Sequence, residues 1–215
     1  ATDLSTGEFT VTEIMDSTKL WAELHRFAPK ECLFSDAFQD EKLLERLPVE
    51  LKTVVNFLPE WRFAFESARS ELLQHFNTLS LDGFGCERLH AGICAAGALI
   101  YYLNETQKQE VKHILSLQNY TISNFMVLDA DTQRNLELTV SIRDGSSKGT
   151  LLEVLDETVT PMGARKLRQC ILQPLLNPEK IEARLVAVGE LKNRIGLQEE
   201  LRDDLDKMYD IERLS

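Results

Sequence analysis

The hydrophobic pattern of this 215-residue chain changes near His113, and that change constrains the fold more than any other feature. Before His113, short strand-like apolar runs alternate with segments whose apolar residues recur every three or four positions. After it, helical periodicity is sustained. Strands separated by helices with short connections favour parallel pairing. The sequence therefore predicts an α/β domain over residues 1–113 followed by an all-α segment over residues 114–215.

The first half opens with a predicted hairpin, in which Gly7 supplies the unusual backbone conformation of the turn. The hairpin adds an antiparallel edge, so we expect one mixed sheet. Strands are expected at 1–4, 9–14, 32–34 and 54–58, and helices at 17–28, at 43–47 with an end at Pro48, at 66–76 and at 86–106. Along the last helix, Gly92, Gly97 and nearby alanines leave one side almost bare, which indicates close packing against the sheet.

Two helix starts stand out in the second half. Thr160-Pro161 and Asn177-Pro178 each combine an N-cap residue with proline at the first helical position, where a missing amide hydrogen costs nothing. A phase break at Gly196 predicts two helices, or one kinked helix, beyond the second start.

Four stretches resemble the MutS family of DNA mismatch-repair proteins. These are TDLSTGEF at 2–9, GFGCERLHAGICAAGAL at 83–99, NLEL at 135–138 and TLLEVLDETVTPMGARKL at 150–167. The resemblance covers almost the whole chain and lies closest to the bacterial, homodimeric branch. It implies a ribonuclease-H-like connector domain over 1–113, with its first strand missing, followed by the first helices of the core or lever domain over 114–215.

The same resemblance implies a non-catalytic role. The chain would couple mismatch and DNA binding to the ATPase domain of its parent and offer a docking surface to the MutL partner. We expect the parent to be a homodimeric, DNA-dependent ATPase that uses ATP and magnesium and binds mismatched double-stranded DNA. The family's Phe-x-Glu wedge and its phosphate loop do not occur here, so we expect an internal piece of a longer protein.

No catalytic, cofactor-binding or metal-binding residue is predicted. In the glycine-rich run 145–150, Lys148 precedes Gly149 instead of following it, so we interpret the run as a surface turn rather than a phosphate loop. Residues 129–140 begin like a calcium loop but lack its essential glycine and glutamate, so Asp129 or Asp131 is expected to cap a helix. A ribonuclease-H-type enzyme gathers a cluster of acids on adjacent strand ends around two metal ions; Asp3 lies on an expected strand, but no such cluster is predicted. A nuclease or transposase-type domain is the alternative function, and a helical adaptor unrelated to repair is a third.

One helix face is a candidate docking surface. On the helix at 66–76, Ala68, Leu72 and Phe76 are spaced to face inward. Outward-facing positions are Ser67, Ser70, Glu71 and Gln74. They are either part of the MutL docking surface that the resemblance implies or an ordinary solvated face.

The helix start at Thr160 and Pro161 is a second candidate site, with a proposed role in supporting the fold and in coupling DNA binding to the ATPase. Its basic patch, Arg165, Lys166 and Arg168, can approach phosphates or acidic side chains, or simply form a solvated face. Gly163 lies in the first turn, where glycine is costly, so we expect another helix or strand to pack closely against it.

Composition bears on DNA binding, on the redox state of the cysteines and on membrane association. A net charge of −11 predicts weak DNA binding by these residues alone, because phosphate contacts need cations. Four cysteines without a Cys-x-x-Cys pair and four histidines without metal-ligand spacing indicate reduced thiols in a cytoplasmic protein and no zinc site. The longest apolar run, Ala91–Leu103, falls short of the roughly 20 residues that span a bilayer, so no membrane association is expected.

Overall fold

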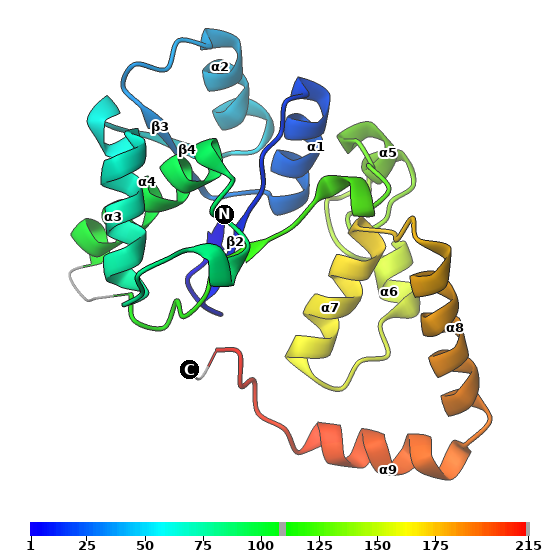
Figure 1. The fold of residues 1–215 in the computed structure, drawn as a ribbon. Helices are drawn as coiled ribbons and strands as arrows, with labels where there is room; N and C mark the ends of the chain where they lie inside the picture. Colours follow the sequence, from blue (N-terminus) through cyan, green and yellow to red (C-terminus); the bar gives the residue numbers. More distant parts are fainter. Residues whose placement is uncertain (108–110, 214–215) are drawn as a thin grey trace. The chain divides into compact units, whose positions relative to one another are not determined.

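The computed structural model describes residues 1–107 and 111–213, which form two compact units. Unit 1 comprises Ala1–Thr121 and combines strands with helices, whereas unit 2 begins at Ile122 and is mainly helical (Figure 1). The expected succession of an α/β part and a helical part is therefore confirmed. The domain boundary between residues 113 and 114 stays a prediction.

The opening hairpin is present. Strand β1 (Thr2–Asp3) pairs antiparallel with β2 (Glu8–Val11), and Gly7 in the turn has φ of +71°. On β2, Thr10 pairs in parallel with Gln118 of β5 (Gln118–Asn119), a strand that the sequence did not indicate. The resulting three-stranded sheet is mixed, with β2 between β1 and β5.

The expectation of one mixed sheet is wrong in detail. Strands β3 (Glu31–Ser35) and β4 (Val54–Leu58) pair in parallel as a separate two-stranded sheet. The physical reason is that alternation of strands and helices predicts parallel pairing between successive strands, as β3 and β4 show, but carries no information on whether that pair joins the hairpin. Unit 1 is thus mixed α/β with two small sheets.

The helices of unit 1 lie close to their expected positions. They are α1 (Ser17–Phe27), α2 (Glu41–Glu50), α3 (Phe65–His75) and α4 (His90–Gln107), with short 3-10 helices η1 (Glu60–Phe63) and η2 (Asp82–Phe84). Two limits differ. Helix α2 continues past Pro48 to Glu50, because a proline in the last turn removes only one amide donor from the helix. Residues 86–89, expected to be helical, form a turn before α4.

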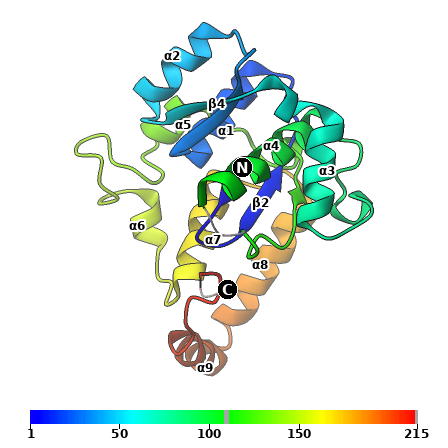
Figure 2. The same ribbon diagram turned by 90° about the vertical axis from the view of Figure 1, so that its left-hand side faces the viewer.

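The core of unit 1 lies where α4 meets α3 and β2, and Figures 1 and 2 show α3 and α4 side by side. Gly92 of α4 faces Val11 of β2, as expected for packing against the sheet. Gly97 instead faces the backbone of Ala68 in α3, so the sheet does not explain that glycine. The largest fully buried side chains here are Phe9, Leu72, Leu81, Ile93, Ile100, Ile114 and Leu117.

Unit 2 is less regular at its beginning than the periodicity predicted. Up to Gly149 it contains η3 (Ile122–Asn124) and α5 (Ala130–Asn135), and the remaining residues form turns and irregular segments. Glu137, Gly145 and Gly149 all have positive φ, which interrupts a helix. Helices α6 (Leu151–Leu155), α7 (Pro161–Leu172), α8 (Pro178–Lys192) and α9 (Ile195–Asp206) follow.

Both predicted helix starts in unit 2 are confirmed. The Thr160 hydroxyl accepts a hydrogen bond from the Gly163 amide, and the Asn177 side chain accepts one from the Lys180 amide. Beyond Asn177 the chain forms two helices, α8 and α9, which meet at a bend (Figure 1). The break falls at Asn193 and Arg194, whereas Gly196 lies inside the first turn of α9.

All four cysteines are free thiols, with Cys86 buried and the others half-buried. Among the residues that the structure describes, no helix has both the length and the apolar character needed to cross a membrane.

Candidate partner-binding and coupling sites

The polar face of α3 is only partly open to solvent. Ser70 and Gln74 are exposed, whereas Ser67 and Glu71 are half-buried. On the opposite side, Ala68 and Leu72 are buried, as their spacing predicts, and the half-buried Phe76 follows the helix as its C-cap residue. The four candidate docking residues therefore form one continuous face with two accessible positions.

A cleft of about 310 Å³ adjoins this face. It is lined by Glu71, Gln74, His75, Phe76, Asn104, Lys112, Ile114 and Leu115. The His75 ring nitrogen lies 2.9 Å from the carbonyl oxygen of Ile114 and fixes one wall. Leu115 is 77% exposed, which makes it an apolar surface group beside the polar α3 face. Sequence reasoning missed Leu115, because an isolated exposed leucine has no periodic signal.

A three-residue network fastens the end of unit 1 to α1. Arg26 Nη2 lies 2.6 Å from Glu23 Oε2, and the Tyr120 hydroxyl donates to the same oxygen at 2.7 Å. The Arg26 guanidinium also stands 3.8 Å from the ring centroid of Phe27. Burial and the hydrogen bond to Glu23 raise the pKa of the Tyr120 phenol. The network holds the chain one residue before the limit of unit 1, and no pattern in the sequence indicates it.

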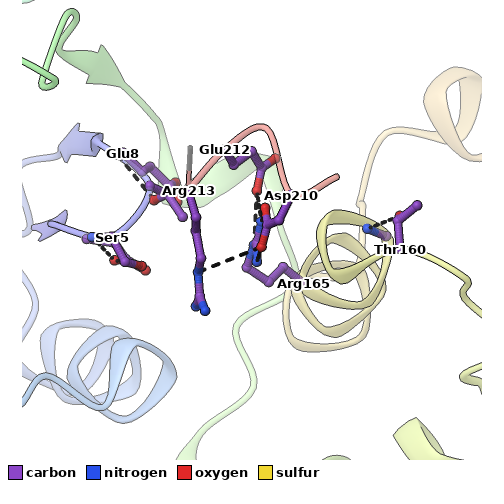
Figure 3. A network of polar contacts seen from close by, with 10 residues as sticks. Ser5, Glu8, Thr160, Arg165, Asp210, Glu212 and Arg213 are labelled. Carbon is purple, nitrogen blue, oxygen red and sulfur yellow. Dashed lines mark hydrogen bonds and ion pairs between the residues drawn. The ribbon is translucent and has the colours of Figure 1, made fainter. Parts of the chain in front are cut away.

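The start of α7 has the predicted N-cap, but the neighbours of Gly163 differ from those expected. Thr160 Oγ1 accepts from the Gly163 amide at 3.0 Å, with Pro161 at the first helical position (Figure 3). A methyl group added at Gly163 would stand 3.0 Å from Thr160 Oγ1 and 3.3 Å from Thr158 Cβ. These nearest neighbours belong to the turn before α7, so the expected close contact with another helix or strand is not what crowds Gly163.

The basic patch of α7 separates into one paired and two exposed side chains. Arg165 binds Asp210 through two nitrogen–oxygen contacts of 2.9 and 2.6 Å and binds Glu212 through contacts of 2.9 and 2.5 Å (Figure 3). These hydrogen bonds raise the pKa of Arg165 and lower that of Asp210. Lys166 and Arg168 are exposed, and the Lys166 ammonium donates to Gln169. Acidic side chains are therefore the partners of Arg165 in this structure.

The patterns set aside as catalytic or metal sites have structural roles. Asp3 accepts hydrogen bonds from the amide and hydroxyl of Ser5, Asp129 caps α5, and Thr150 caps α6. Lys148 lies in an exposed turn. Across residues 1–107 and 111–213, no group of three or more His, Cys, Asp or Glu side chains is placed to hold a metal ion. The nuclease alternative has no support from these positions.

Comparison with known proteins covers both units. The family model of MutS domain II matches residues 1–115, and that of MutS domain III matches residues 131–215. The DNA mismatch repair protein MutS of Halothermothrix orenii is 42% identical over 214 residues, that of Desulfosudis oleivorans 41% over 217, and that of Protochlamydia amoebophila 42% over 214. Each alignment covers 99% of this chain but only 24 or 25% of the relative, so the chain spans about a quarter of their length. The chain belongs to the MutS family of DNA mismatch-repair proteins, with matches to its domain II and its domain III.

Proposed function

We propose that this chain is the connector domain (1–113) and the first part of the core or lever domain (114–215) of a mismatch-recognition ATPase, and that it relays information between DNA and the ATPase. The consecutive matches to MutS domains II and III carry this proposal. We also propose a ribonuclease-H-like plan for the connector; the mixed β1–β2–β5 sheet with its neighbouring helices supports it, and the separate β3–β4 pair does not. The proposed domain boundary lies eight residues before the limit of unit 1 at Thr121.

The relay is mechanical and not catalytic. Coupling between distant sites needs stiff elements that can take up two arrangements. Helices α8 and α9, joined at Asn193 and Arg194, are stiff elements of this kind. In the proposed parent, a cytoplasmic homodimer, ATP and magnesium bind in the ATPase domain. Mismatched double-stranded DNA binds mainly through other domains, because a chain of net charge −11 lacks the cations for tight phosphate binding.

We further propose that Ser67, Ser70, Glu71 and Gln74 dock the MutL partner. Their support is the continuous polar face of α3 and the adjoining cleft, which shares Glu71 and Gln74 and exposes Leu115 beside them. A concave region with both polar and apolar groups is the kind of surface on which a partner side chain can be anchored.

The docking proposal is tested by Ser70→Arg combined with Glu71→Arg in the intact protein. Substitution at the exposed Ser70 should shift stability by no more than about 0.5 kcal/mol, whereas Glu71 is half-buried at the cleft, so urea unfolding of the variant must first show that the fold persists. We expect MutL recruitment to a mismatch to fall while mismatch binding persists. The control is Val49→Arg with Glu45→Arg on the exposed face of α2, which changes the net charge equally and should leave recruitment unchanged. Unchanged recruitment in the α3 variant would remove the docking role and leave the relay untouched.

A further inference from the structure

Helices α8 and α9 are held in unit 2 by little apolar contact. Neither helix, both fully described, contains a buried residue. Polar groups instead connect the end of this segment to the start of α7. Arg202 of α9 donates to the Glu157 carbonyl oxygen at 3.0 Å, in the turn before α7. Arg165 of α7 binds Asp210 and Glu212, which follow α9.

The Arg165 contact is well formed for a partly exposed ion pair. All three guanidinium nitrogens donate, two of them to the two oxygens of Asp210 and two to one oxygen of Glu212. The side chains of Arg165 and Asp210 are 28% and 19% exposed. Forked contacts between a guanidinium and a carboxylate are the strongest ordinary ion pairs and fix geometry as well as distance. Arg165 therefore determines where the chain after α9 lies within unit 2.

The same residues offer a second arrangement. Arg213 Nε lies 3.9 Å from Asp210 Oδ2, one of the oxygens that Arg165 binds. When Arg165 leaves, Asp210 has another cation within reach, three residues along its own segment. Because Arg213 already lies near Asp210 while Arg165 is bound, the carboxylate keeps a cation beside it after Arg165 leaves, which lowers the free-energy cost of opening.

We propose that Arg165, Asp210 and Glu212 form a latch between the start of α7 and the end of α9, and that its opening lets the lever segment change arrangement. This inference rests on the proposed relay and specifies its moving contact. With the latch closed, α7 and the end of α9 move together. With it open, the chain after α9 is released from α7, and the Arg202 hydrogen bond to the Glu157 carbonyl still links α9 to the turn before α7 while the bend at Asn193 and Arg194 can change.

Hydrogen exchange of the intact protein, read by mass spectrometry, tests the latch directly. Arg165→Glu should speed amide exchange in residues 207–213 by about tenfold, because the turn amides there lose their anchor. Arg165→Glu with Asp210→Arg restores an opposite-charge pair and should return exchange close to that of the unmodified protein. Lys166→Glu, the same charge change one residue away, should leave exchange unchanged.

A second measurement, the loss of affinity for mismatched DNA when ATP is added, separates the latch from the relay. We expect Arg165→Glu to reduce this ATP effect and the charge swap to recover it. Equal exchange in the unmodified protein and Arg165→Glu, or equal acceleration by Lys166→Glu, overturns the latch and leaves the relay standing. If Arg165→Glu speeds amide exchange in residues 207–213 but leaves the ATP-induced loss of DNA affinity unchanged, the contact holds the chain after α9 but has no part in the relay, and the proposal is overturned.

Discussion

Gly97 of α4 lies directly on the backbone of Ala68 in α3: a methyl group added at Gly97 would stand 2.2 Å from the Ala68 carbonyl oxygen. Two further atoms, the carbonyl carbon and Cα of Ala68, would each be 2.5 Å away. These are backbone atoms, so they cannot turn aside as a flexible side chain can. Glycine at this position sets the closest approach of the two helices that enclose the core of unit 1.

Gly97→Ala should therefore destabilise unit 1 by about 1–3 kcal/mol or more, since overpacking forces the helices apart. The chain's two tryptophans, Trp21 and Trp61, both lie in unit 1, so urea unfolding followed by their fluorescence reports on this unit. Gly83→Ala is the matched control, because no atom lies within 4 Å of the added methyl group. If both variants unfold at the same urea concentration, the helices are not in the close contact described.

Tyr120 gives a prediction about hydrogen bonding at the end of unit 1. Its hydroxyl donates to the Glu23 carboxylate at 2.7 Å, and both side chains are partly buried. Tyr120→Phe removes this donor and should cost about 1.5–3 kcal/mol, the usual range for a hydrogen bond to a charged group. Glu23→Ala is a useful comparison, because it removes both this acceptor and the ion pair with Arg26 and should cost more.

The stability difference between the unmodified chain and Tyr120→Phe should depend on pH. Burial and Glu23 raise the pKa of the folded phenol above the unfolded value of about 10. A raised pKa means that the stabilisation is fully present below about pH 10 and is lost as pH increases from there through the folded pKa. Tryptophan-monitored unfolding at pH 7, 9 and 11 measures the difference. A difference that grows above pH 10 would contradict the assignment.

The cap of α7 can be tested by separating its hydroxyl from its methyl group. Thr160→Val keeps the shape but removes the acceptor for the Gly163 amide, and should destabilise α7 by about 1 kcal/mol. Thr160→Ser keeps the acceptor and should retain most of the stability. Amide exchange in the first turn of α7 measures both effects. Faster exchange in the serine variant than in the valine variant would show that packing of the methyl group matters more than the cap.

Features that depend on neighbouring residues were predictable from the sequence. The Thr160 hydroxyl meets an amide only three residues ahead, and the same spacing joins Asn177 to Lys180. Gly7 was also identified correctly, because a short hairpin turn requires positive φ at one residue. Each of these assignments needed no knowledge of the rest of the fold.

Features created by distant pairing were not predictable in this way. Gln118 and Asn119 are polar and have no strand periodicity, and they become β5 because they pair with Thr10 and Val11. Arg165 was identified as a candidate residue, but its partner Asp210 is 45 residues further along the chain. Gly163 was expected to contact another helix or strand, but the crowding atoms belong to Thr158 and Thr160 in the preceding turn. Helix propensity indicates that a glycine is unusual at a position and does not indicate which neighbour crowds it.

Gly163 can be compared with Gly189, a glycine in α8 that has no atom within 4 Å of an added methyl group. Gly189→Ala should stabilise α8 by about 1 kcal/mol, which is the helix-propensity gain of alanine over glycine. Gly163→Ala should gain less, because its methyl group would stand 3.0 Å from Thr160 Oγ1 and 3.3 Å from Thr158 Cβ. Loss of helical circular dichroism on heating measures both. Equal stabilisation by Gly163→Ala and Gly189→Ala would show that Thr158 and Thr160 move aside without a measurable cost in free energy.

Gly163→Leu extends this test to the proposed relay. A leucine side chain cannot fit beside Thr158 and Thr160 without displacing the turn, so we expect about 1–3 kcal/mol of destabilisation in α7. Because Arg165 is two residues further along the same helix, displacement of this turn should also disturb its contact with Asp210. In the intact protein, the effect of ATP on DNA affinity should weaken before ATP binding itself does. Measuring ATP affinity and ATP-induced DNA release in the same variant separates these effects: if both fall together, Gly163 supports the general fold and has no specific part in the relay.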